Sequence, residues 1–85
     1  MVETQKQSDQ EKLVRSFETR LEVFAEKVLM SQLSGHKSVL EDVQVRIERV
    51  FINAALKISK NNVSKAAKLL GMNRNTLNRK IKEYA

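Results

Sequence analysis

The stretch that decides the fold is Asn62–Ala85, which reads NVSKAAKLLGMNRNTLNRKIKEYA. Its single glycine, Gly71, follows Ala67 by four residues and precedes Leu77 by six. Two helices that cross steeply need a small residue at the crossing, a residue free to take positive φ at the turn, and a large apolar side chain in the crevice. This spacing therefore predicts a helix-turn-helix, a motif whose second helix enters the major groove of DNA.

Polar capping residues mark where the two helices of this motif begin. Asn61 or Asn62 is a suitable N-cap for a helix over Val63–Leu70. Asn73 is the expected N-cap of a helix over Arg74–Tyr84. The inward face of that second helix is expected to carry Leu77, Ile81 and Tyr84.

The outward face of the second helix carries side chains of the types that read DNA. Arginine can donate two parallel hydrogen bonds to guanine, and asparagine can match the hydrogen-bonding edge of adenine. The base-reading candidates, which together form the expected reading face, are Arg74, Asn73, Asn75, Asn78 and Arg79. The candidates for phosphate contacts in and near the motif are Thr76, Lys65, Lys68, Lys80 and Lys82. The alternative is that the three asparagines are ordinary capping and polar surface residues.

The net charge of +6 is concentrated in the same part of the chain. Residues 1–56 carry eight basic and nine acidic side chains, whereas residues 57–85 carry eight basic side chains against Glu83 alone. A polyanion such as double-stranded DNA is the expected partner, because each neutralised phosphate releases counterions. A basic tail that serves only solubility is the alternative, but these cations alternate with an apolar pattern.

The first part of the chain is expected to build a dimer. Residues 1–10 are polar and without periodicity, and we expect a disordered leader or linker stub there. A first helix is expected from about Glu11 to Leu33, and it should end at Ser34-Gly35. A second helix should start after Ser38 as its N-cap and run to about Ile58, and Glu41 stands at the capping-box spacing from Ser38. The apolar positions are too many for one 85-residue chain to bury, so residues 11–58 predict a homodimer. Its expected core is Phe17, Leu21, Phe24, Val28, Val43, Ile47, Val50 and Phe51.

Other classes of function find little support in the composition. There is no cysteine, and the one histidine, His36, is expected in a turn away from any acid–base group. The acidic residues Glu18, Glu22 and Glu26 alternate with basic residues, which is typical of a solvated helix face. We therefore expect no enzyme activity, metal or cofactor. No apolar run approaches a membrane span, no aromatic platform for RNA is evident, and a cytoplasmic location is expected.

Residues 61–85 contain the pattern AAxLLGxNRxTLxRKxKEY. This segment resembles the C-terminal helix-turn-helix of the Fis family, which includes the nucleoid protein Fis and the DNA-binding domains of NtrC-like enhancer-binding activators. Upstream, QLSG followed by a mostly apolar helix resembles the family's first helix, glycine-containing turn and long second helix. The resemblance thus covers about residues 12–85.

The resemblance implies an all-α, four-helix subunit, intertwined as a twofold homodimer through its first two helices, with paired recognition helices that bend DNA. It assigns the base-reading arginine to Arg74, a flanking asparagine to Asn73 and a basic reading-face residue to Arg79. Residues 59–85 would form the DNA-binding unit. The phosphate contacts that the resemblance implies are Thr76, Asn62, Ser64 and Lys65.

This chain departs from Fis at its start, where Fis carries a mobile β-hairpin arm that activates DNA invertases. The ten polar residues here have no strand character. We therefore expect a domain of an NtrC-like activator that follows a receiver and an ATPase domain and serves the alternative sigma factor; no Walker-type motif occurs in the chain itself. The alternatives are a free-standing Fis-like nucleoid-associated protein and, in another class, an oligomerisation scaffold without specific DNA binding.

Overall fold

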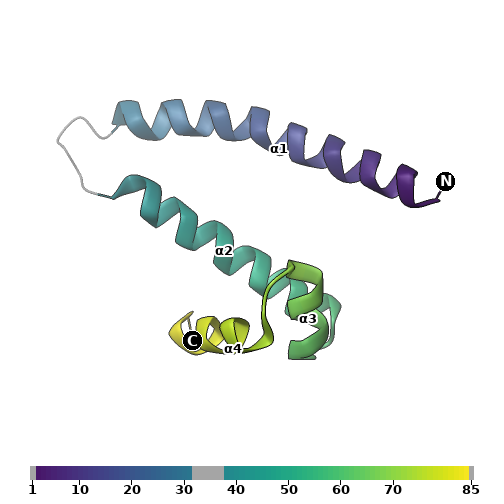
Figure 1. Cartoon of the computed structure of the whole chain (residues 1–85). Coiled ribbons are helices and arrows are strands. Elements are labelled where there is room, and N and C mark those ends of the chain that lie inside the picture. Colours follow the sequence, from purple (N-terminus) through teal and green to yellow (C-terminus); the bar gives the residue numbers. More distant parts are fainter. Residues whose placement is uncertain (1, 32–37, 85) are drawn as a thin grey trace. The chain divides into compact units, whose positions relative to one another are not determined.

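The computed structural model describes residues 2–31 and 38–84, and all regular structure in these ranges is α-helical (Figure 1). The helices are α1 (Val2–Ser31), α2 (Val39–Ile58), α3 (Val63–Leu70) and α4 (Arg74–Tyr84). Helix α1 forms one compact unit, and α2, α3 and α4 form a second unit that begins at Ser38. The chain is therefore all-α.

Helix α1 begins at Val2, so residues 2–10 are helical rather than the disordered leader or linker stub that their polar composition predicts. The physical reason is that this stretch contains no proline or glycine to stop a helix, and glutamine, glutamate and lysine are good helix formers. The helix ends at Ser31, and the expected stop at Ser34-Gly35 lies outside the described residues, as does His36. Along α1 the side chains of Phe17 and Phe24 are exposed.

Helix α2 begins at Val39, one residue after the expected N-cap, Ser38. The predicted capping box is not formed, because Ser38 has a φ of 59° and its side chain makes no capping hydrogen bond. A side-chain cap needs extended backbone at this position. The Ser38 carbonyl oxygen instead accepts a backbone hydrogen bond from Asp42 N–H at 3.0 Å.

The turn between α2 and α3 uses two consecutive left-handed residues. Lys60 has a φ of 55° and Asn61 a φ of 66°. Such a conformation costs a residue with a Cβ about 1–2 kcal/mol, and asparagine tolerates it better than lysine does. Asn61 N–H donates to the Leu56 carbonyl at 2.7 Å, which closes the end of α2. The chain then turns directly into α3.

The core of the second unit is made where the three helices cross. Its buried residues are Ile52 and Ala55 from α2, Ala66 and Ala67 from α3, and Leu77 from α4. The partly buried residues around it are Leu56, Val63, Leu70, Met72, Ile81 and Tyr84. Because three of the five buried residues are alanines, the helix backbones can approach closely. This packing fixes α3 and α4 as a corner mounted on α2 (Figure 1).

Gly71 ends α3 and allows that corner. Its φ is +72°, and its backbone N–H donates to the Lys68 carbonyl at 3.2 Å. Met72 N–H bonds the Ala67 carbonyl at 3.0 Å, which completes a glycine C-cap. The chain can therefore reverse between α3 and α4 within three residues.

Candidate nucleic-acid interface

Burial of one face of α4 determines which of its side chains point outward. Leu77 is 0% exposed and lies against α2 and α3. Arg74, Asn75 and Arg79 are exposed. Asn78 is half-buried, so it lies at the edge of the outward face rather than at its centre.

The phosphate candidates lie mainly on exposed positions of the same corner. Asn62, Ser64 and Lys65 are exposed at the start of α3, and Lys82 is exposed on α4. Thr76 is half-buried in the first turn of α4. Lys68 is also exposed, on the last turn of α3. Lys80 differs from these residues, because its ammonium group already has a partner within the chain.

Two asparagines serve as side-chain caps of the two helices. The side-chain oxygen of Asn62 accepts a hydrogen bond from Lys65 N–H at 3.1 Å. The side-chain oxygen of Asn73 accepts a hydrogen bond from Asn75 N–H at 2.7 Å. Each carbonyl oxygen is thus engaged, and the amide NH₂ group is the part that remains to donate to a ligand. For Asn73 this favours a donated hydrogen bond over the paired donor and acceptor that adenine recognition uses.

The N-terminal turns of α3 and α4 contain no acidic residue. In contrast, the first turn of α2 carries Glu41 and Asp42. Helix N-termini have a partial positive charge that acidic side chains ordinarily complement. At the starts of α3 and α4 that charge remains for an external anion, and phosphate is the anion that helix N-termini commonly bind.

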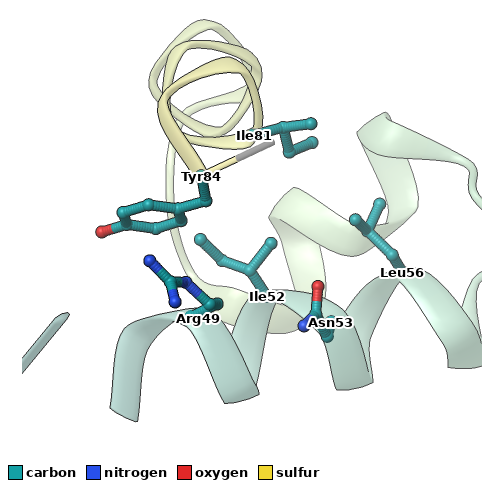
Figure 2. A pocket seen from close by; sticks show the side chains of 6 residues that line it. All are labelled: Arg49, Ile52, Asn53, Leu56, Ile81 and Tyr84. Atoms are coloured by element: carbon teal, nitrogen blue, oxygen red, sulfur yellow. The ribbon is translucent and has the colours of Figure 1, made fainter. Parts of the chain in front are cut away.

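Helix α4 is also tied to α2 by one carboxylate. Glu48 Oε1 accepts from Lys80 Nζ at 2.6 Å and from the Tyr84 hydroxyl at 2.5 Å. The guanidinium carbon of Arg49 lies 5.2 Å from the centroid of the Tyr84 ring, a cation–π distance (Figure 2). These contacts hold the C-terminal half of α4 in place, whereas Leu77 holds its N-terminal half.

A small open hollow lies next to this tie, between α2 and α4 (Figure 2). Its volume is about 190 Å³. The lining residues are Arg49, Ile52, Asn53, Leu56, Ile81 and Tyr84. Pockets for small-molecule ligands usually measure about 300–1,000 Å³, so this hollow is smaller than a typical ligand site.

The shared carboxylate shifts the pKa of all three groups that meet there. Hydrogen bonds from Lys80, and then from Tyr84, hold the pKa of Glu48 below its ordinary value. The hydrogen bond to Glu48 in turn raises the pKa of Lys80 and the pKa of Tyr84. A lowered acid pKa stabilises the fold above the unfolded pKa of about 4.3, and this contribution is lost as pH falls through the folded value. The raised pKa values of Lys80 and Tyr84 stabilise the fold below about pH 10, and this contribution is lost as the pH rises through the pKa values of the folded protein.

We expect the tie between α2 and α4 to weaken in acid. The stability difference between the wild type and Glu48→Gln should be present at pH 7 and should shrink toward pH 3, because protonated Glu48 no longer pairs with Lys80. Urea unfolding at a series of pH values measures this difference. Asp42→Asn is the matched control, since Asp42 pairs with Arg46 on the surface of a single helix and such pairs contribute little. A difference that stays constant from pH 7 to pH 3 would contradict the role given to Glu48.

No sequence pattern predicted a role for Glu48 or Arg49. Glu48 lies 32 positions before Lys80, and nothing local in the sequence pairs them. A partial signal was present on α4 itself. Lys80 lies three residues after Leu77 and four before Tyr84, so helical periodicity places it beside the inward face.

Residues 45–84 match the family model described as "Bacterial regulatory protein, Fis family". This part of the chain belongs to the Fis family. The match begins within α2 and extends through α3 and α4, so the matched residues include Glu48, Lys80 and Tyr84 as well as the helix-turn-helix.

Three bacterial proteins are similar to this chain over most of its length. The proteins named "DNA-binding transcriptional regulator NtrC" from Escherichia coli (strain K12), Salmonella typhimurium (strain LT2) and Klebsiella pneumoniae are each 40% identical to this chain over 68 residues. The aligned region is 80% of this chain and 14% of each relative, so the chain spans a small part of their length. No solved structure matches the chain significantly.

No helix within residues 2–31 or 38–84 is long and apolar enough to cross a membrane. Within the same ranges, His, Cys, Asp and Glu side chains do not gather in groups of three or more that could hold a metal ion.

Proposed function

We propose that this Fis-family domain binds double-stranded DNA as a homodimer and gives a bacterial transcriptional regulator its sequence specificity. The observation that carries the proposal is the α3–α4 corner. It presents exposed cations and two helix N-termini without acidic residues, and the fully buried Leu77 fixes its orientation. Similarity to the NtrC proteins supports a transcriptional role.

In this proposal some residues of the corner contact DNA bases and others contact phosphates. Arg74, Asn75, Asn78 and Arg79 would contact base edges, with Asn73 contributing its amide donor. The phosphate contacts would come from Asn62, Ser64, Lys65, Thr76 and Lys82. The phosphate contacts supply affinity that falls with salt, and the base contacts supply the preference for one site.

The proposal of a homodimer rests on the exposure of apolar residues of α1 and α2. In the single chain Phe17, Phe24, Val50 and Phe51 are exposed, whereas Leu21, Val28, Val43 and Ile47 are half-buried. These two sets are the proposed dimer core. A twofold pair of subunits would present two recognition helices to successive major grooves, and DNA bending would let both engage.

We further propose that the domain serves an NtrC-like activator in the cytoplasm, joined to receiver and ATPase domains of a longer chain. In this role the domain itself is not an enzyme and needs no cofactor. A free-standing Fis-like nucleoid protein and an oligomerisation scaffold are the competing functions. Selection of bound duplexes from a random pool separates the three, since the activator should enrich one motif, the nucleoid protein a weak consensus, and the scaffold none.

Arg74→Ala should reduce the preference for the selected site by about 1–3 kcal/mol, because a bidentate arginine–guanine contact contributes about that much. Fluorescence anisotropy with the selected duplex and a scrambled duplex measures the preference. Arg46→Ala is the matched control, since Arg46 is also an exposed arginine but belongs to α2 and not to the α3–α4 corner. If the wild type binds no duplex in a salt-dependent manner, the scaffold function is correct and the proposal fails.

A further inference from the structure

The cations of α4 fall into two groups with different surroundings. Arg74, Arg79 and Lys82 are exposed, whereas the side chain of Lys80 is 24% exposed. The Lys80 ammonium lies 2.6 Å from Glu48 Oε1, and the Glu48 side chain is itself only 34% exposed. Lys80 is thus directed toward α2, whereas Arg79 and Lys82 are exposed to solvent.

Partial burial strengthens this pair compared with an ordinary surface ion pair. A hydrogen bond between ionised groups is short and about twice as strong as a neutral one. The Tyr84 hydroxyl donates to the same carboxylate oxygen, so both Lys80 and Tyr84 hold Glu48 in one position. The contrasting pair is Asp42–Arg46, at 3.3 Å on one helix with side chains 65% and 72% exposed.

We propose that Glu48 withholds Lys80 from the DNA backbone and is a positioning residue of the recognition helix. This inference rests on the proposed function and changes the role expected for Lys80, from a phosphate contact to a tether between α4 and α2. Its benefit is specificity. A lysine free to reach phosphates raises affinity for every duplex equally, whereas a lysine held by Glu48 adds nothing to non-specific binding and keeps the reading face aligned.

The test is a double-mutant cycle measured as the salt dependence of binding to a non-specific duplex. The variants are Glu48→Gln, Lys80→Met and the double variant. Glutamine at position 48 has nearly the same shape as glutamate and can still accept the Tyr84 hydrogen bond, so α4 retains one of its two ties. Circular dichroism at each salt concentration confirms that the variants remain folded under the conditions of the assay.

We expect Lys80→Met alone to leave the slope of log affinity against log salt unchanged. Glu48→Gln should steepen the slope by about 0.9 per subunit, the value for one additional phosphate contact. The double variant should return to the wild-type slope. Lys82→Met is the control for an exposed lysine of the same helix, and it should make the slope shallower by about 0.9 per subunit.

Two results would overturn the inference while leaving DNA binding intact. A shallower slope for Lys80→Met in the wild-type background would show that Lys80 already contacts phosphate. An increase caused by Glu48→Gln that persists when Lys80 is methionine would show general repulsion between Glu48 and DNA. Asp42→Asn removes the same charge from α2 and measures that general effect. Absence of any salt-dependent binding by the wild type would instead reject the proposed function.

A second measurement needs no DNA and therefore tests the pairing by itself. Amine-reactive labelling of the free protein, followed by mass spectrometry, should modify Lys80 several-fold more slowly than Lys82. Glu48→Gln should bring the two rates together, and Asp42→Asn should leave them apart. Equal rates in the wild type would show that Lys80 is not held by Glu48.

Discussion

Leu77→Ala is expected to destabilise the α2–α3–α4 unit by about 2–5 kcal/mol, the range for removing a fully buried leucine side chain. Leu77 is 0% exposed and contributes the largest fully buried side chain among the described residues. Its fully buried neighbours are Ile52 and three alanines, and larger side chains such as Met72 and Ile81 pack around them. The cost within the range is set by how far these larger side chains move into the space that the leucine leaves.

This loss is large compared with the total stability of so small a unit. Domains are stable by about 0.05–0.15 kcal/mol per residue, which for the unit spanning Ser38–Ala85 amounts to about 2–7 kcal/mol. Leu77→Ala should therefore leave α4 unfolded in a large fraction of molecules and weaken DNA binding for that reason alone. Urea unfolding followed by circular dichroism measures the change directly.

Leu69→Ala provides the matched control for Leu77→Ala. Leu69 is a leucine of α3 in the same unit, and it is 59% exposed. The same chemical change there should alter stability by less than about 0.5 kcal/mol. If both substitutions cost the same amount, Leu77 does not fill the crevice of the helix-turn-helix, and the orientation of the reading face loses its physical basis.

The boundaries of α3 and α4 could be predicted from the sequence because each depends on a local signal. Asn62 and Asn73 cap the two helices through their own side chains, and Gly71 takes the positive φ at the turn. Such signals act within a few residues, so no knowledge of the packing is required. The same reasoning failed at Ser38, where the residue type suits a cap but the backbone is left-handed.

The surroundings of Lys80 could not be predicted, because they depend on how α2 and α4 cross. Its positive charge and its place in the basic helix-turn-helix predicted a phosphate contact for Lys80, as for Lys65, Lys68 and Lys82. Its partner, Glu48, lies 32 positions away on a helix assigned to dimerisation. The start of α1 was misplaced for a different reason, because polar composition alone does not stop a helix that lacks proline and glycine.

Phe51→Ala should weaken the proposed dimer far more than it weakens the fold of a single subunit. Phe51 is 57% exposed in the single chain, so its removal should cost that chain little. If a second subunit buries it fully, the loss on association is about 3–5 kcal/mol per side chain. A loss of 3 kcal/mol raises a dissociation constant more than a hundredfold. Phe24→Ala on α1, where Phe24 is 47% exposed, should have an effect of the same kind.

Sedimentation equilibrium over a range of protein concentrations separates the two contributions, because association depends on concentration and folding within one chain does not. Phe51→Ala should shift the monomer–dimer midpoint to concentrations at least a hundredfold higher. Leu69→Ala, which removes an exposed apolar side chain outside the proposed dimer core, should leave the midpoint unchanged. A wild-type protein that stays folded and monomeric at every concentration would reject the dimer. The two reading faces would then no longer be joined, and only a single α3–α4 corner would remain to bind DNA.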